Sequence, residues 1–348
     1  MGLAMMKPPT FLFVHLSDEC NLRCTHCHYW KPSIRSKVDN ISIERKMELL
    51  LEFASLNPRG VVVTCGAEST MHLDEFFQFT KECRRLGLRC LSVTNGSKIS
   101  TPTIADQVVA DGPTEISVSL DSHVESLHDE MRGVKGSFKS VVRAIKLLLE
   151  SRRKLGRMGQ RVHAMLLLFD DNYLDLEDTY DFALNELGVD KLKINVLQPT
   201  FGCSSGPDEF FTRHSRMDAD RLEAVLHRCN QRFKLNANPI WISQVGMYVR
   251  TLSKAAVNER GWSVPIHTTE QICNSPDRNI VIDMSGTARL CVSEGFPGMD
   301  LRHPGDMRFF WESSGILRGQ MRTCTQLCGI THSMRRISST FDGLTHFD

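Results

Sequence analysis

Three cysteines near the N-terminus, Cys20, Cys24 and Cys27, stand in the run CNLRCTHC with the spacing C-x3-C-x2-C. This spacing allows one short loop to place three thiolates around three corners of a cubane 4Fe–4S cluster. Iron–sulfur clusters are usually held by four cysteines, so one iron would have no protein ligand. A small molecule can chelate an iron of that kind. The loop therefore predicts a cluster that takes part in chemistry.

Two other metal sites fit parts of the same loop. A tetrahedral zinc site requires four ligands, and His26 or His28 would supply the fourth. Residues 24–28 also match C-x-x-C-H, the attachment signature of c-type haem. Haem attachment requires export, and residues 1–16 lack a charged n-region, a long apolar segment and a small-residue cleavage site. Haem also leaves Cys20 without a role, so zinc is the stronger alternative.

The composition limits the class of protein. With 348 residues the chain can form one large α/β domain and a smaller one. Its 42 Lys and Arg against 41 Asp and Glu give a net charge of +1, which indicates neither a nucleic-acid nor a membrane-surface partner. The chain contains no run of 18 apolar residues, so we expect no transmembrane helix. Twelve cysteines without an export signal favour metal ligation in a reducing compartment, so we expect a cytoplasmic protein.

Short apolar segments alternate with helical patterns along residues 11–197. We expect strands at 11–16, 61–65, 89–94, 115–120, 161–169 and 191–197, and helices near 42–56, 71–87, 101–111, 136–155 and 174–188. Nearly continuous apolar strands separated by amphipathic helices are typical of buried parallel strands in right-handed β/α units. Ligands bind at the carboxyl ends of such strands. Because the cysteine loop follows the first strand directly, we expect it on that edge of the sheet.

Together with this loop, two turns resemble motifs of the radical S-adenosylmethionine (radical SAM) superfamily. CGAEST, after the second expected strand, is similar to the G-G-E-P motif that binds the SAM amino group. Gly66 and Glu68 match it, whereas Ala67 and Ser69 depart from it. After the third expected strand, Asn95 stands in a T-N-G turn that is common in the family.

The run SVSLDSHVESLHDEMRGVKGSF resembles the S-x-D-G…H-D-x-x-R-G-x-x-G-S-F stretch of the SPASM/twitch branch of this superfamily. The resemblance implies that Ser119 and Asp121 lie near the SAM ribose and methionyl group. It also implies that Arg132 pairs with the SAM carboxylate, a task that suits a planar bidentate cation. Ser122 replaces the usual glycine. His26 takes the position of an aromatic residue that packs by the adenine.

A second set of cysteines lies in residues 264–348, where the sequence indicates short strands and turns. The spacing C-x12-G-x4-C around Gly286, followed by C-x3-C, resembles the twitch subdomain, which holds one auxiliary 4Fe–4S cluster. The implied ligands are Cys273, Cys291, Cys324 and Cys328. A four-cysteine zinc site is the alternative.

The resemblance implies an α/β protein with three parts. Residues 1–197 would form a partial (β/α)6 radical SAM barrel, residues 198–263 a connecting segment near the substrate, and residues 264–348 a small α+β twitch-type domain. The cofactors would be SAM and two 4Fe–4S clusters, one of which binds SAM while the other is auxiliary. In the family, SAM chelates the open iron, and an electron from the cluster splits the sulfonium to give a 5′-deoxyadenosyl radical. A low-potential donor of the flavodoxin or ferredoxin type would supply that electron.

This radical would remove hydrogen from a C–H bond, and the protein then decides the fate of the substrate radical. Cys203 follows the sixth expected strand in a Gly/Ser loop, where a thiol can return hydrogen to the opposite face. We therefore expect epimerisation. The alternative is dehydrogenation of an alcohol, in which a base removes a proton and the auxiliary cluster accepts an electron. Ribosomal-peptide modification, or a zinc-binding scaffold without enzymatic activity, are further alternatives.

The substrate class is bounded by the position of the cysteine loop. The loop begins at residue 20, which leaves no room for the N-terminal leader-peptide-binding domain of many peptide-modifying relatives. We therefore expect a small polar metabolite of the sugar, aminoglycoside or nucleoside type. Charged side chains of residues 198–263 would hydrogen-bond it, and the candidates are Asp208, Glu209, Arg213, His214 and Arg216.

Overall fold

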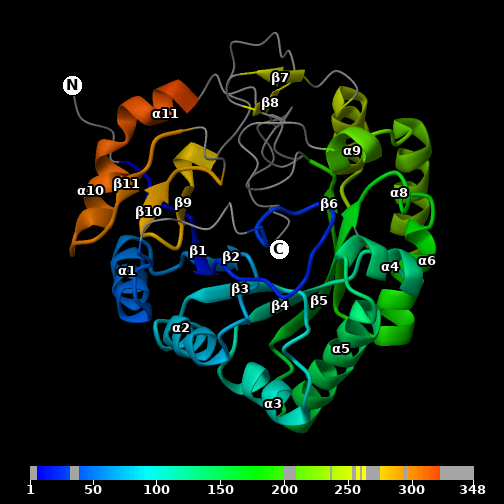
Figure 1. Ribbon diagram of the computed structural model, residues 1–348, viewed down its shortest axis with the longest axis horizontal. Coiled ribbons are helices and arrows are strands. Elements are labelled where there is room, and N and C mark those ends of the chain that lie inside the picture. Colours follow the sequence, from blue (N-terminus) through cyan, green and yellow to red (C-terminus); the bar gives the residue numbers. More distant parts are fainter. Residues whose placement is uncertain are drawn as a thin grey trace.

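The computed structural model describes residues 6–31, 39–198, 209–235, 237–252, 256–258, 261–263, 275–292 and 296–321. Its main feature is a curved nine-stranded sheet with the order β11-β10-β9-β1-β2-β3-β4-β5-β6. Helices cover the outer side of this sheet, and its two edge strands, β11 and β6, do not meet (Figure 1). The α/β partial barrel predicted from the sequence is confirmed.

Five β/α units and a sixth strand form the larger part of the sheet, and the fourth unit carries two helices. Their strands are β1 (Phe11–Ser17), β2 (Val61–Gly66), β3 (Arg89–Thr94), β4 (Glu115–Ser119), β5 (Arg161–Leu168) and β6 (Lys191–Val196), each parallel to the next. Their helices are α1 (Ile43–Leu56), α2 (Leu73–Arg85), α3 (Pro102–Asp111), α4 (Glu125–Arg132), α5 (Ser137–Lys154) and α6 (Leu176–Asp181), the last continued by a π-helical turn (Phe182–Leu187). After β6 come α7 (Glu209–His214), α8 (Ala219–Phe233) and α9 (Pro239–Leu252), then a small hairpin of β7 (Ala256–Asn258) and β8 (Gly261–Ser263).

Local sequence signals account for several helix boundaries. Ser42 caps α1 by accepting a hydrogen bond from Arg45 N, and Asp218 caps α8 in the same manner. Thr101 caps α3, and Pro102 occupies its first turn, where a missing N–H costs nothing. Gly133 ends α4 in the left-handed conformation, at φ 63°.

Two apolar clusters lie on opposite faces of the sheet. The larger one fills the layer between strands and helices and includes Leu12, Val14 and Leu16 of β1. The smaller one contains Phe11 of the same strand, packed with Phe13. Because successive side chains of a strand point to opposite faces, the smaller cluster lies on the inner face of the curved sheet. The other members of this inner cluster are Val61, Val63 and Leu91.

The C-terminal described residues belong to the same sheet. A short 3-10 turn (Ser275–Asp277) leads into β9 (Asn279–Ile282), which pairs with β1 in parallel. β10 (Thr287–Arg289) and β11 (Met299–Asp300) extend the sheet in antiparallel fashion, and helices α10 (Asp306–Ser313) and α11 (Gly315–Met321) follow. The sequence indicated short strands and turns here, and it missed these two helices. The domain boundaries at 197/198 and 263/264 stay predictions.

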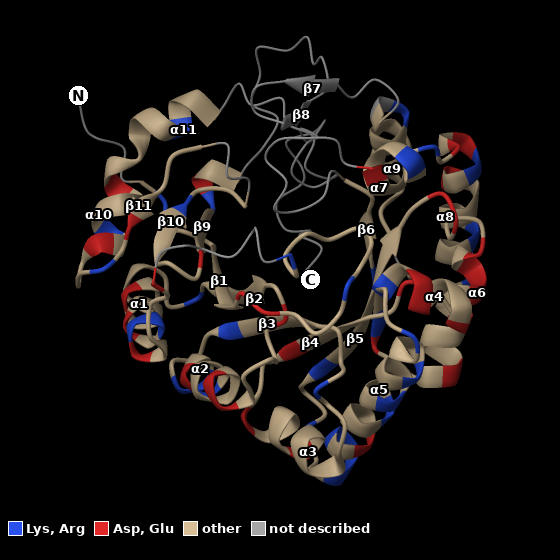
Figure 2. Ribbon diagram, viewed as in Figure 1, with Lys and Arg blue, Asp and Glu red and all other residues tan. Residues whose placement is uncertain are grey.

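Acidic and basic residues are interspersed along the outer helices (Figure 2). Within the described part of the chain, no helix has the length and apolar character that crossing a bilayer requires.

Candidate active site at the carboxyl edge of the sheet

The loop that carries Cys20, Cys24 and Cys27 leaves the sheet at Ser17, the last residue of β1. It is fixed to the end of α4 by backbone hydrogen bonds, from Thr25 N to Met131 O (2.9 Å) and from Arg23 N to Arg132 O (3.2 Å). A Cβ atom on Gly133 would lie 2.3 Å from Arg23 O. Glycine is therefore required where the helix end meets the cysteine loop.

The three thiols lie in surroundings that disfavour a bare thiolate. Burial raises the pKa of the Cys20 thiol to about 11 and that of Cys27 to about 12, and it also raises the pKa of Cys24. A thiolate at these positions therefore needs a cationic partner, which iron would provide. Three buried thiols that require a cation to become thiolates fit the binding of an iron–sulfur cluster.

The spacing of the sulfurs also separates a cluster from a single zinc ion. Among the described residues, three Cys, His or carboxylate ligand atoms lie within 4.8 Å of one another only at Asp170, Asp171 and His214. The three cysteines are thus spread more widely than that. Thiolates on one tetrahedral zinc lie about 3.8 Å apart, as the Zn–S bond length requires. The three thiols thus do not form the compact group that a single zinc ion requires.

A buried ion pair lies directly against the cysteine loop. Arg132 Nε is 2.7 Å from Asp121 Oδ2, and Arg132 Nη1 is 3.8 Å from Cys24 Sγ. The Asp121 carboxylate is fully buried and also accepts a hydrogen bond from Leu167 N at 3.1 Å. The sequence placed both residues at the SAM site, and the structure places them beside a cysteine of the loop. The contact between Arg132 and Cys24 was not foreseen.

Glu68 joins the carboxyl ends of β2 and β3. Its carboxylate accepts hydrogen bonds from Thr70 N (3.0 Å), Thr70 Oγ1 (2.6 Å), Thr94 Oγ1 (2.6 Å) and Asn95 N (2.7 Å). Asn95 Nδ2 in turn lies 3.9 Å from Cys20 Sγ. The two sequence motifs thus form one network that reaches the cysteine loop. Binding of the SAM amino group by Glu68 stays a prediction.

The remaining described candidates lie around the same edge. Gly66 has φ 99°, and a Cβ atom there would lie 2.9 Å from His15 Cγ. Ser119 is the buried last residue of β4. The His26 ring packs edge-on against Phe210, with centroids 5.9 Å apart. Their roles toward SAM stay predictions.

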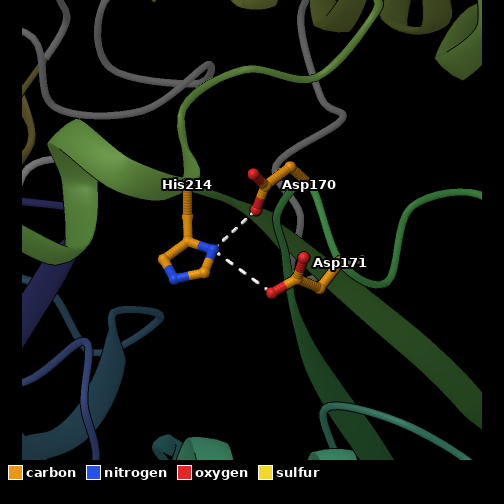
Figure 3. A group of neighbouring side chains, drawn as sticks. All are labelled: Asp170, Asp171 and His214. Atoms are coloured by element: carbon orange, nitrogen blue, oxygen red, sulfur yellow. Dashed lines mark hydrogen bonds and ion pairs between the residues drawn. The ribbon is translucent and has the colours of Figure 1, made fainter.

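A group at the end of β5 was only partly foreseen. Asp170 and Asp171 follow β5, and His214 ends α7; His214 Nδ1 lies 2.7 Å from Asp170 Oδ1 and 3.3 Å from Asp171 Oδ2 (Figure 3). The His214 ring stacks on Phe210 at a centroid distance of 4.4 Å, and Phe210 also packs against His26. The sequence named His214 only among several charged candidates, and the two aspartates directly after a strand were the missed signal.

Several predicted residues lie outside the described part of the chain, namely Cys203, Asp208, Cys273, Cys324 and Cys328. Of the proposed auxiliary-cluster ligands, Cys291 is described and is half-buried just after β10. Gly286 forms the turn between β9 and β10 with φ 85°, as its place between the two strands requires. The auxiliary cluster itself stays a prediction.

Comparison with protein families agrees with this geometry. The family model described as the radical SAM superfamily matches residues 14–183. An AdoMet-dependent heme synthase of Methanosarcina barkeri is 28% identical over 146 residues, which is 42% of this chain and 41% of that protein. The antilisterial bacteriocin subtilosin biosynthesis protein AlbA of Bacillus subtilis is 25% identical over 190 residues, 54% of this chain and 39% of AlbA. The matches thus span less than half of either relative.

Solved structures share the fold over most of the chain. Streptococcus suis SuiB superposes with a TM-score of 0.63 over 90% of this chain and 68% of SuiB, at 15% identity. Native anSMEcpe with bound AdoMet gives a TM-score of 0.57 over 86% of this chain and 80% of that protein, at 14% identity. At these identities the likeness concerns the fold.

Proposed function

Because residues 14–183 are a radical SAM domain, we propose that the whole protein is a radical SAM enzyme that removes hydrogen from a C–H bond of a polar substrate. The observation that carries the proposal is the loop of Cys20, Cys24 and Cys27, held at the carboxyl edge of the sheet against Arg132. When bound there, a 4Fe–4S cluster and SAM supply a 5′-deoxyadenosyl radical.

The described residues would bind the cluster, fix the turns around it and exclude water. The three cysteines would hold the cluster, and the hydrogen bonds of Glu68 fix the turns that follow β2 and β3. The inner apolar cluster, which includes Phe11 and Phe13, lines the inner face of the sheet and would exclude water from that part of the barrel. A dry and fixed cavity is what a reactive radical requires.

Anaerobic reconstitution tests this proposal. The wild-type protein should bind about four irons at this loop, and about eight per chain if the auxiliary site also holds a cluster. It should release 5′-deoxyadenosine from SAM under reduction. Cys24→Ala should abolish that release, whereas Cys229→Ala, at a fully buried cysteine on α8, serves as the control. A zinc-loaded wild type that leaves SAM intact would refute the proposal.

Epimerisation of a small polar metabolite of the sugar, aminoglycoside or nucleoside type is the reaction that we infer first. It uses Cys203 as the hydrogen donor to the substrate radical, and its support is the sequence position of this thiol after β6. A low-potential flavodoxin or ferredoxin would supply the electron. The likeness to AlbA, a bacteriocin biosynthesis protein, makes a peptide substrate the second class to screen.

The group at His214 favours dehydrogenation as a second candidate. With Nδ1–H donated to Asp170, neutral His214 carries its lone pair on Nε2, the ring nitrogen that faces away from both carboxylates (Figure 3). That atom can accept the proton of a substrate hydroxyl after a hydrogen atom has left the adjacent carbon. One electron then passes to an acceptor of the iron–sulfur class, and a carbonyl forms. The ring contact through Phe210 to His26 supports a place for His214 beside the SAM site.

A further inference from the structure

We propose that Arg132, oriented by Asp121, raises the reduction potential of the cluster by donating a hydrogen bond to the sulfur of Cys24 and placing a positive charge beside it. The inference rests on the proposed function, because it requires a 4Fe–4S cluster on the cysteine loop. It gives Arg132 a task that is independent of the SAM carboxylate.

The geometry holds the guanidinium in one place. Nε lies 2.7 Å from Asp121 Oδ2, and Nη1 lies 3.8 Å from Cys24 Sγ, within the range of a hydrogen bond to sulfur. The Arg132 side chain is 10% exposed and the Asp121 side chain is fully buried. An arginine guanidinium is always protonated in proteins, and the Asp121 carboxylate beside it favours the charged form further, so Arg132 stays cationic.

Asp121 is itself fixed from three directions. Its Oδ1 accepts a hydrogen bond from Leu167 N, its backbone oxygen accepts one from Asn172 Nδ2 (2.9 Å), and its N–H donates to His128 Nδ1 (3.2 Å). The aspartate therefore cannot follow a rotation of Arg132, and the arginine has one buried orientation. A rigid cation beside a ligand sulfur is the arrangement that changes a redox potential most directly.

The sign of the effect follows from charge. Reduction adds one negative charge to the cluster, and both a nearby cation and a hydrogen bond to a ligand sulfur stabilise the reduced form. Removing the cation should therefore disfavour reduction. Removing the negative charge of Asp121 should favour it, because that charge opposes the added electron from a fully buried position. The two changes thus act in opposite directions.

Redox titration of the reconstituted protein, followed by electron paramagnetic resonance before SAM is added, tests the inference. Arg132→Gln should lower the ratio of reduced to oxidised cluster at least tenfold at a fixed solution potential, which corresponds to about 59 mV for one electron. Asp121→Asn should raise the same ratio. The matched control is Arg152→Gln, which removes a similarly buried arginine that pairs with Asp190, where α5 meets the start of β6.

The outcomes separate this inference from the proposed function. The inference is supported if the ratio of reduced to oxidised cluster falls in Arg132→Gln, rises in Asp121→Asn and stays at the wild-type value in Arg152→Gln. A ratio within threefold of wild type in Arg132→Gln, or shifts of one sign in both variants, would overturn it. If Arg132→Gln fails to hold the cluster, the direction of the Asp121→Asn shift decides. A wild type that binds no cluster would instead refute the proposed function.

Discussion

At the scale of the residue, the carboxylate of Glu68 shows how one buried side chain connects two strand ends. Four hydrogen bonds reach it, from the backbone and hydroxyl of Thr70, from Thr94 and from the backbone of Asn95. The side chain is 2% exposed, so each lost bond would leave a buried donor unpaired. The turns that face the cysteine loop are therefore set before any cofactor binds.

The fate of the substrate radical is also decided by single residues. If the reaction is epimerisation, solvent deuterium enters the inverted carbon in heavy water, and Cys203→Ala abolishes its entry. If it is dehydrogenation, the product is lighter by two hydrogen atoms, and His214→Gln lowers product formation about 100-fold, as loss of a general base does. 5′-Deoxyadenosine release should persist in both variants, because neither residue holds the cluster.

Mass spectrometry of substrate, product and 5′-deoxyadenosine from one reaction provides the measurement. The control for His214 is His227→Gln, an exposed histidine on α8. An oxidised product that forms at the wild-type rate in His214→Gln would exclude this residue as the base. A product that gains deuterium in Cys203→Ala would exclude the thiol.

Residue types and spacing predicted which residues gather at the carboxyl edge of the sheet. They did not predict which of these residues contact one another. The cysteine loop and the Glu68, Asn95, Asp121 and Arg132 positions came from motifs that follow strand ends, and parallel strands bring such ends together. The contacts depend on side-chain direction, which spacing does not contain. The pair of Asp170 and His214 joins residues 44 positions apart, so no local pattern could reveal it.

At the scale of the element, Asp129 connects two helices. Its carboxylate accepts hydrogen bonds from Gly136 N (2.6 Å), Ser137 Oγ (2.9 Å) and Phe138 N (2.8 Å). It therefore caps the N-terminus of α5 from its position on α4. Since the cysteine loop is bonded to the end of α4, this cap also holds the loop's support in place.

Asp129→Ala should lower the free energy of unfolding by about 1–2 kcal/mol near neutral pH. Although desolvation opposes it, the hydrogen bonds from Phe138 and Gly136 lower the pKa of Asp129 below its usual value of 3.8. A lowered pKa in the folded state gives stability that is present above 3.8 and is lost as the pH falls through the folded value. The difference between wild type and variant should thus shrink in acid.

Urea denaturation at pH 7 and at pH 3 measures this difference. Glu150→Ala, at an exposed position of α5, is the control and should show little change at either pH. If wild type and Asp129→Ala differ by the same free energy of unfolding at both pH values, the effect does not come from the ionised carboxylate, and the capping role is wrong.

The sequence predicted helices and strands well in the region where short apolar strands alternate with amphipathic helices. All six expected barrel strands and all five expected helices of that region are present, because buried parallel strands and amphipathic helices have distinct periods. Helix α4 was missed, since its eight residues are too few to establish a period. The pairing of β9 with β1 was missed as well, because sheet neighbours distant in sequence leave no local mark.

At the scale of the whole molecule, β1 joins the two ends of the described chain. It pairs with β2 on one side and with β9 on the other, and the cysteine loop continues directly from it. The segment that carries Cys291 therefore continues the sheet that the six barrel strands form. A disturbance of the C-terminal strands would act on the strand that supports the cysteine loop.

Arg45 on α1 forms several polar contacts with this C-terminal part. Its Nε donates to Leu301 O (3.1 Å) and its Nη2 to His303 O (2.6 Å), while Nη1 pairs with Glu52 at 3.3 Å. Glu52 also accepts a hydrogen bond from Met307 N at the start of α10. The arginine side chain is 11% exposed, so water cannot readily replace these bonds.

Arg45→Ala should therefore release β11 and α10 from α1 while the barrel strands stay in place. Hydrogen bonds to a charged donor are worth about 1.5–3 kcal/mol, so amide hydrogen exchange in residues 299–313 should become at least tenfold faster. Exchange in β4, on the other side of the barrel, should remain at the wild-type rate, and Arg143→Ala, at an exposed position of α5, should change neither region. Faster exchange throughout the molecule would mean that Arg45 stabilises the whole fold rather than this attachment.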